Sequence, residues 1–117
     1  MAWTVIFADE FERDLEDFSE AVQIEVFAGA KLIANYGPQL GRPHVDTLNG
    51  SAFPNMKEFR FRAEHGVWRL AFAFDPVRSA VLLIAGNKTG VSERRFYKTL
   101  IDKADERYRT HLRKLGL

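Results

Sequence analysis

The sequence predicts an α+β fold with the element order β-α-α-β-β-β-α, in which two N-terminal helices lie on one face of an antiparallel sheet and a C-terminal helix ends the chain. Two patterns predict it. Apolar residues alternate with polar ones at strand period in 57–72, and they recur at helical spacing in 9–36 and 93–115. With 117 residues, 46% of them hydrophobic, residues 1–117 have the length of one domain.

The first third of the chain is predicted to contain one strand and two helices. Trp3 to Ala8 has the composition of a short strand, and Asp9 stands where an N-cap would begin the first helix. Ser19 is predicted to cap the second helix. That helix should end near Tyr36, because Gly37 supplies a C-cap and the following proline cannot continue the helix.

The rest of the chain is predicted to form a loop, three strands and a helix. Residues 37–54 carry repeated Gly and Pro and are expected to be irregular. Residues 57–62 and 67–72 form a hairpin, Ser79 to Gly86 forms the next strand, and Ser92 caps the final helix. That helix is expected to cover part of the sheet formed by Ala71, Ala73, Val81 and Leu83.

The hairpin has one apolar and one charged face. Its apolar face carries Phe59, Phe61, Trp68, Leu70 and Phe72, and its charged face carries Glu58, Arg60, Arg62 and Arg69. A four-residue turn at 63–66 pairs Phe61 with Trp68, Phe59 with Leu70 and Arg60 with Arg69. If the next strand pairs Phe72 with Leu82 and Leu70 with Ile84, Asn87 falls beside Val67 and Lys88 approaches the arginine face near Arg62 and Arg69.

The predicted pair of Arg60 and Arg69 places like charges opposite each other, which is unfavourable in a sheet. Two interpretations remain open. An anionic ligand would remove the repulsion, or the face is solvated and Glu58, diagonal to Arg69, neutralises one guanidinium.

The net charge of +1 hides a polarity along the chain. Residues 1–36 hold eight acidic and two basic residues, whereas residues 88–117 hold nine basic and four acidic ones. This distribution can offer a cationic surface to RNA while the acidic helices face elsewhere. The chain has no cysteine, no apolar stretch long enough for a membrane and no signal-peptide pattern at its start, so we expect a cytoplasmic protein.

The residues favour phosphodiester chemistry without a cofactor. No phosphate-binding glycine loop and no histidine pair with metal-ligand spacing occurs, so neither a metal nor a nucleotide cofactor is predicted. Guanidinium groups can bind a phosphodiester and stabilise the charge of its transition state, and RNA supplies its own 2′-hydroxyl nucleophile. Candidates for the proton transfers are Glu58, Lys57 and Lys88, with Tyr97 or His65 assisting; Phe96 or Tyr97 could stack on a base.

Several motifs in order along the chain resemble the HigB-like, phage-related branch of the RelE/ParE toxin superfamily. They are Gly41-Arg-Pro-His-Val-Asp-Thr-Leu-Asn-Gly-Ser51, Met56-Lys-Glu-Phe-Arg60, Trp68-Arg-Leu-Ala-Phe-Ala-Phe-Asp-Pro76, Gly86-Asn-Lys-Thr-Gly90 and Arg95-Phe-Tyr-Lys98. The resemblance implies a RelE-like fold and the toxin of a type II toxin–antitoxin pair. It also implies a helix-turn-helix antitoxin as partner, in a hetero-oligomer, and cleavage of messenger RNA on the ribosome.

By motif, the resemblance implies catalytic roles for Arg60, Arg69 and Lys88, to which the residue chemistry adds Glu58. The residues expected to bind RNA are Lys57, Arg62, His65, Arg94, Arg95 and Tyr97. Two alternatives stay open: a ParE-like inhibitor of DNA gyrase, and a toxin-like binding domain without catalytic activity.

Overall fold

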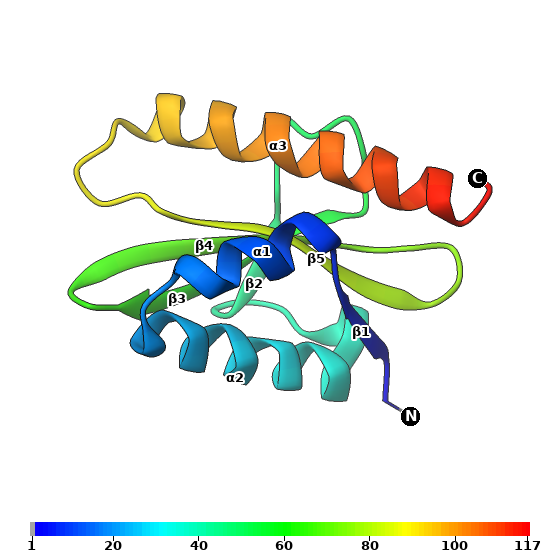
Figure 1. Ribbon diagram of the computed structural model, residues 1–117, viewed down its shortest axis with the longest axis horizontal. Coiled ribbons are helices and arrows are strands. Elements are labelled where there is room, and N and C mark those ends of the chain that lie inside the picture. Colours follow the sequence, from blue (N-terminus) through cyan, green and yellow to red (C-terminus); the bar gives the residue numbers. More distant parts are fainter. Residues whose placement is uncertain (1) are drawn as a thin grey trace.

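The computed structural model describes residues 2–117, which form a five-stranded sheet with helices on both sides (Figure 1). The strand order across the sheet is β1-β5-β4-β3-β2. The predicted α+β class and the order of the predicted elements are confirmed. The elements are β1 (Thr4–Phe7), α1 (Asp9–Asp17), α2 (Glu20–Tyr36), the short 3₁₀ helix η1 (Gly37–Gln39), β2 (Val45–Thr47), β3 (Met56–Ala63), β4 (Gly66–Phe74), β5 (Ser79–Asn87) and α3 (Glu93–Lys114).

Two features of the sheet differ from the prediction. The segment predicted to be an irregular loop contains β2, whose Val45 is buried and lies opposite Phe59 of β3. A three-residue strand between glycines and prolines is too short for its alternation to be recognised. In addition, β1 pairs with β5 in parallel, so the sheet is mixed rather than wholly antiparallel.

The predicted hairpin register is confirmed, with Phe61 opposite Trp68 and Arg60 opposite Arg69. The turn holds Glu64 and His65 at φ values of 52° and 62°, the left-handed conformation that a tight two-residue hairpin turn requires. The strands therefore display the apolar and charged faces that the sequence predicts.

The register between β4 and β5 is confirmed at one end only. Phe72 lies opposite Leu82 as predicted, but Leu70 lies opposite Ala85 rather than Ile84, and Asn87 lies opposite Trp68. The register shifts by one residue because β5 has one extra residue, Leu83, opposite the step from Ala71 to Phe72 of β4. Alternation alone does not reveal such a shift.

The helices divide between the two faces of the sheet (Figure 1). On the apolar face, the ring of Phe18 after α1 meets Trp68 edge-on at 5.5 Å, and α2 packs against β3. On the other face, α3 packs against β4 and β5 and buries its own Tyr108. The four sheet residues expected beneath this helix are fully buried: Ala71, Ala73, Val81 and Leu83.

Most of the predicted helix ends are confirmed. The hydroxyls of Ser19 and Ser92 accept hydrogen bonds from the backbone of α2 and α3, and Gly37 ends α2 with a φ of 56°. The prediction for Asp9 is wrong: Ala8 is the N-cap, and Asp9 is the first helical residue. Its carboxylate instead pairs with Lys114 at the end of α3.

The segment between β2 and β3 is fastened to α3 by one carboxylate. Asp105, 7% exposed, accepts hydrogen bonds from the Ser51 hydroxyl at 2.5 Å and from the backbone N–H of Ala52 at 2.9 Å. These two hydrogen bonds hold the loop against α3.

The helices differ strongly in polarity. The 22 residues of α3 are rich in charge, whereas α2 is apolar over most of its 17 residues. Within residues 2–117, no helix combines the length and the apolar content that crossing a membrane would require.

Gly29 allows α2 to lie close to the sheet. A Cβ atom at this position would come within 2.8 Å of the ring of Phe59. We expect Gly29→Ala to lower the free energy of unfolding by about 1–2 kcal/mol, because overpacking outweighs the gain in helix propensity. Urea unfolding measures the change. Gly41→Ala is the control, since its Cβ would meet nothing within 4 Å; equal or higher stability of the Gly29 variant would contradict this account.

Candidate functional site

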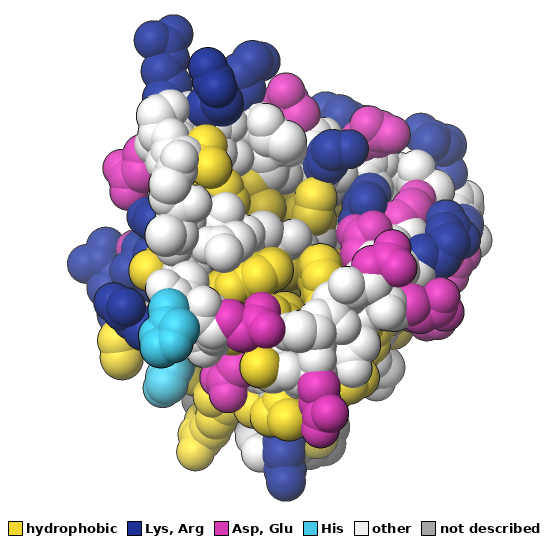
Figure 2. Space-filling view, turned by 60° about the vertical axis from the view of Figure 1, so that its left-hand side comes forward, with side chains coloured by type: hydrophobic (Ala, Val, Ile, Leu, Met, Phe, Trp, Pro, Cys, Tyr) yellow, Lys and Arg dark blue, Asp and Glu magenta, His cyan; other side chains and the backbone are white. Residues whose placement is uncertain are grey.

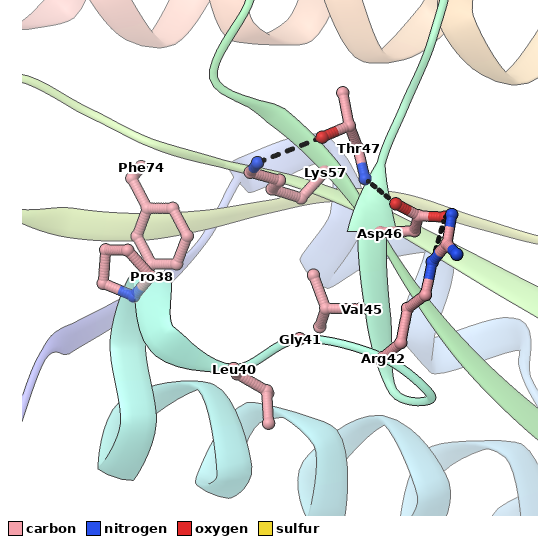
Figure 3. A pocket seen from close by; sticks show the side chains of 9 residues that line it. All are labelled: Pro38, Leu40, Gly41, Arg42, Val45, Asp46, Thr47, Lys57 and Phe74. Atoms are coloured by element: carbon pink, nitrogen blue, oxygen red, sulfur yellow. Dashed lines mark hydrogen bonds and ion pairs between the residues drawn. The ribbon is translucent and has the colours of Figure 1, made fainter.

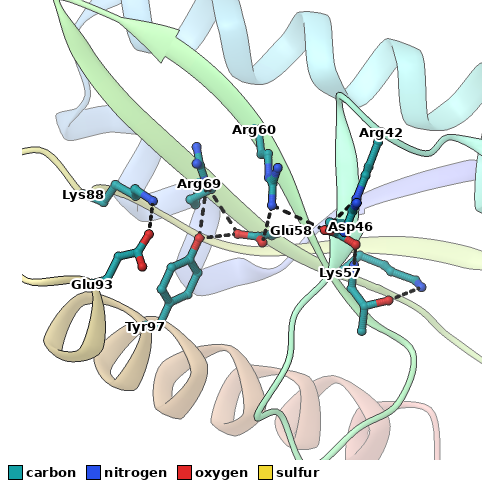
Figure 4. A network of polar contacts seen from close by, with 10 residues as sticks. Arg42, Asp46, Lys57, Glu58, Arg60, Arg69, Lys88, Glu93 and Tyr97 are labelled. Carbon is teal, nitrogen blue, oxygen red and sulfur yellow. Dashed lines mark hydrogen bonds and ion pairs between the residues drawn. The ribbon is translucent and has the colours of Figure 1, made fainter.

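A buried carboxylate lies between the two opposed arginines on the charged face of the sheet (Figure 4). Glu58 is only 5% exposed. Its Oε2 lies 3.4 Å from Nη2 of Arg60, and its Oε1 lies 3.4 Å from Nε of Arg69. One carboxylate thus pairs with both guanidiniums and relieves the repulsion that their register creates.

Tyr97 of α3 completes this group from the helix side. Its hydroxyl donates a hydrogen bond to Oε1 of Glu58 at 2.8 Å and accepts one from Nε of Arg69 at 3.2 Å. Burial, and then the hydrogen bond to the Glu58 carboxylate, raise the pKa of Tyr97. The phenol therefore remains protonated at neutral pH and serves as a donor.

The charged group continues onto β2, which sequence analysis did not predict. Asp46 lies opposite Glu58, and its Oδ2 is 3.5 Å from Arg60 Nη2 and 2.9 Å from Arg42 Nη2. The backbone N–H of Thr47 and then the Arg42 side chain lower the pKa of Asp46. Sequence reasoning missed Asp46 and Arg42 because nothing placed their segment beside β3.

The two arginines retain unused hydrogen-bond donors. Nη1 of Arg69 donates a hydrogen bond to the backbone oxygen of Trp68, and no partner of its Nη2 occurs among residues 2–117. Within the same part of the chain, Nε of Arg60 is buried without a hydrogen-bond partner. An unpaired buried donor is costly, so a ligand that accepts this hydrogen would be favoured.

Two recesses open beside these side chains. One, of about 430 Å³, is lined by Glu25, Arg60, Phe61, Arg62, Val67 and Arg69. The other, of about 200 Å³, is lined by Thr47, Leu48, Asn49, Glu58 and Tyr97. Both arginines thus border the larger recess, and Glu58 borders the smaller one.

Lys88 lies on the far side of Tyr97. Its ammonium is 5.5 Å from the centre of the Tyr97 ring and forms an ion pair of 2.8 Å with Glu93. This hydrogen bond lowers the pKa of Glu93. Lys88 thus borders the arginine group through the tyrosine ring rather than by direct contact with Glu58.

Lys57 does not join the group. It follows the strand alternation onto the opposite face, where its Nζ bonds Thr47 Oγ1 at 3.3 Å. There it lines a recess with Pro38 and Leu40 near the end of α2 (Figure 3). No bulge at the start of β3 turns Lys57 towards Glu58, since the register there is regular.

The other predicted RNA-binding residues lie at the edges. His65 is exposed at the tip of the hairpin, and Arg94 and Arg95 are exposed in the first turn of α3. Phe96 is buried in the core, which leaves Tyr97 as the aromatic side chain of this pair beside the charged group.

Charge is distributed unevenly over the surface (Figure 2). In this view, Lys and Arg side chains gather over α3 at the top, and Asp and Glu gather on the right and towards the bottom. No set of three His, Cys, Asp or Glu residues in 2–117 is arranged to hold a metal ion.

The fold has a known counterpart. The structure superposes on a doubly substituted mutant of the E. coli toxin RelE in its free state with a TM-score of 0.65, covering 92% of this chain and 98% of that one at 14% identity. At that identity the likeness shows the fold alone, which is that of RelE.

Sequence comparison gives the family. The family described as phage derived protein Gp49-like (DUF891) matches residues 13–109. Two Mycobacterium tuberculosis proteins are similar: "Putative toxin HigB3" at 41% identity, covering 88% of each chain, and "Putative toxin HigB2" at 44% over 74% of this chain. The match to HigB2 spans 43% of the length of that protein. The chain belongs to the Gp49-like, HigB-type family, and its fold is that of RelE.

The raised pKa values of two tyrosines predict how stability depends on pH. Burial is the first cause for both Tyr97 and Tyr108. Because each folded-state pKa lies above the usual 10.0, both groups stabilise the fold while protonated, and the free energy of unfolding should fall as pH rises above this value. Urea unfolding across this range measures it. The Tyr97→Phe variant should show a weaker fall; an unchanged pH dependence would argue against the shift at Tyr97.

Proposed function

We propose that this protein is the toxin of a type II toxin–antitoxin pair and acts as a metal-independent endoribonuclease on messenger RNA at the ribosome. The observation that supports it most is the pair of opposed guanidiniums, held by the buried Glu58 at the edge of a recess. The matches to HigB proteins and to the RelE fold support the toxin class.

In the proposed reaction, Arg60 and Arg69 bind the scissile phosphate. The 2′-oxygen of the substrate attacks phosphorus, the bond to the 5′-oxygen breaks, and a cyclic phosphate and a free 5′-hydroxyl result. Negative charge increases on the phosphoryl oxygens as the transition state forms. Fixed guanidiniums stabilise that charge more than the ground-state charge.

We assign the proton transfers to Glu58 and Tyr97, from the position of the carboxylate and the protonation of the phenol. Glu58 is proposed as the base that takes the proton of the 2′-hydroxyl, because its carboxylate lies between both phosphate-binding arginines. Tyr97, which stays protonated, is proposed to orient Glu58 and to stand near the leaving oxygen as a proton donor. Lys88 and His65 are the other candidates for the acid.

The remaining basic residues are proposed to extend the contact with RNA. Arg62 borders the larger recess, and Arg94 and Arg95 lie exposed at the start of α3. Lys88 adds a charge between these two regions. Lys57, on the opposite face, would contact RNA only outside the proposed cleavage site.

The proposed setting is the cytoplasm, with a helix-turn-helix antitoxin as the neutralising partner. Inhibition of DNA gyrase in the manner of ParE is less well supported, because the similar proteins found are HigB and RelE. A toxin-like domain without activity would retain the antitoxin contact and lose the chemistry.

Replacing either phosphate-binding arginine should abolish most of the activity. We expect Arg69→Ala and Arg60→Ala to lower the rate of mRNA cleavage on ribosomes by about 10²–10³-fold, since each removes charge from the transition state. Mapping of transcript ends in a translation extract measures it. Arg113→Ala, which removes an exposed guanidinium from the other end of α3, is the control.

Three results would argue against the assignment. Folded Arg69→Ala or Arg60→Ala protein that cleaves as fast as wild type would contradict the roles of the arginines. Loss of DNA synthesis with intact mRNA after induction would favour gyrase as the target. Normal growth after induction without an antitoxin, with no cleavage in the extract, would favour a binding domain.

Glu58→Gln tests the base while keeping the shape of the side chain. We expect the rate to fall by about 10²-fold, because an amide cannot take the proton of the 2′-hydroxyl. Circular dichroism checks folding, because Glu58 also pairs with both arginines. A folded Glu58→Gln variant that cleaves as fast as wild type would move the base to another group, such as Lys88.

A further inference from the structure

Two large apolar side chains lie on the outward, solvent-facing side of α2, beside polar residues such as Glu20 and Lys31. Val22, Val26 and Ile33 point into the core and are buried, yet Ile24 and Phe27 on the other side are 56% and 54% exposed. A surface helix normally carries polar residues on its outer side, and a helix that is apolar all round is normally covered. The composition of α2 therefore indicates a partner surface.

This surface includes a recess of the size of one large side chain. The recess, of about 300 Å³, is lined by Phe7, Glu12, Leu15 and Phe27. The rings of Phe7 and Phe27 lie 5.8 Å apart, and Phe7 stacks on the buried Phe11 at 5.9 Å. Its apolar wall rests on the core and is thus rigid enough to receive an anchor residue.

Most charged side chains that border the apolar patch are acidic; the exposed basic ones on these two helices are Arg13 and Lys31. Glu12 lines the recess, Glu16 lies one turn further along α1, and Glu20 lies one turn before Ile24 on α2. All three are exposed, and none takes part in an ion pair among residues 2–117. Residues 1–36 together carry eight acidic and two basic residues.

The acidic side chains beside the patch favour a partner with basic residues. Two copies meeting through this face would place two acidic borders against each other, which opposes a symmetric dimer. A helix with an apolar side and Lys or Arg on its flanks would bury the patch and pair with the free carboxylates.

We propose that the patch formed by Ile24, Phe27 and the recess beside Phe7 docks a basic-flanked amphipathic helix of a different protein, with one large apolar side chain in the recess. The proposal rests on the proposed function in one respect: the antitoxin is the protein that supplies this helix. It does not depend on the proposed ribonuclease activity, because Glu58 and its arginines lie on the opposite face of the sheet, the face on which α3 packs.

Two synthetic helical peptides with the same leucine face, one flanked by lysine and one by glutamate, test the proposal. Fluorescence anisotropy should show that the full chain binds the lysine-flanked peptide at least about tenfold more tightly, with affinity falling as salt rises. The Ile24→Gln/Phe27→Gln variant should lose at least about tenfold of this affinity. Val77→Gln, which alters an equally exposed apolar residue in the β4–β5 turn, should bind normally.

The outcomes separate this proposal from the ribonuclease assignment. Arg69→Ala should keep the peptide affinity, and Ile24→Gln/Phe27→Gln should keep mRNA cleavage. Equal affinity for both peptides, absence of binding, or binding unaffected by the double substitution would overturn the proposal. Sedimentation that shows a wild-type dimer dissolved by the double substitution would also overturn it, since a second copy would then cover the face.

Discussion

The site depends on one interaction: the buried carboxylate of Glu58 held between two guanidiniums. The hairpin register places Arg60 directly opposite Arg69, an arrangement that costs energy unless a negative charge lies between them. Glu58 supplies that charge, and the Tyr97 hydroxyl fixes its orientation from α3. The Tyr97 hydroxyl therefore links α3 directly to the charged face.

The arginine face has features of both interpretations, a face that is neutralised by Glu58 and a face that binds an anion. Glu58 neutralises one guanidinium, as a purely structural face requires. The whole group still holds three arginines (Arg42, Arg60 and Arg69) against two carboxylates (Asp46 and Glu58), which leaves one net positive charge. The unpaired Nε of Arg60 adds a donor that protein groups among residues 2–117 do not satisfy. An arrangement that is stable without a ligand and still incomplete is suited to binding a phosphate and releasing it.

The sequence was sufficient to predict the hairpin register, the two faces and the central residues, because strand alternation fixes all three at once. It was insufficient for Arg42 and Asp46, since β2 is held by its pairing to β3 rather than by its own pattern. The extra residue of β5, Leu83, shifted the expected partner of Leu70, and Lys57 was separated from Glu58 by the same alternation that grouped the arginines. Tertiary contacts decided the position of β2 and the partner of Leu70, whereas strand alternation alone decided the position of Lys57.

The central claim is that the two arginines bridged by Glu58 bind a phosphodiester. The most direct measurement is NMR of the arginine Nε–H groups during titration with a short RNA whose 2′-hydroxyls are methylated, so that it cannot be cleaved. The account predicts that the Nε–H signals of Arg60 and Arg69 shift most and that the signal of Arg113 stays in place. Unchanged signals of Arg60 and Arg69 at saturating RNA would contradict it.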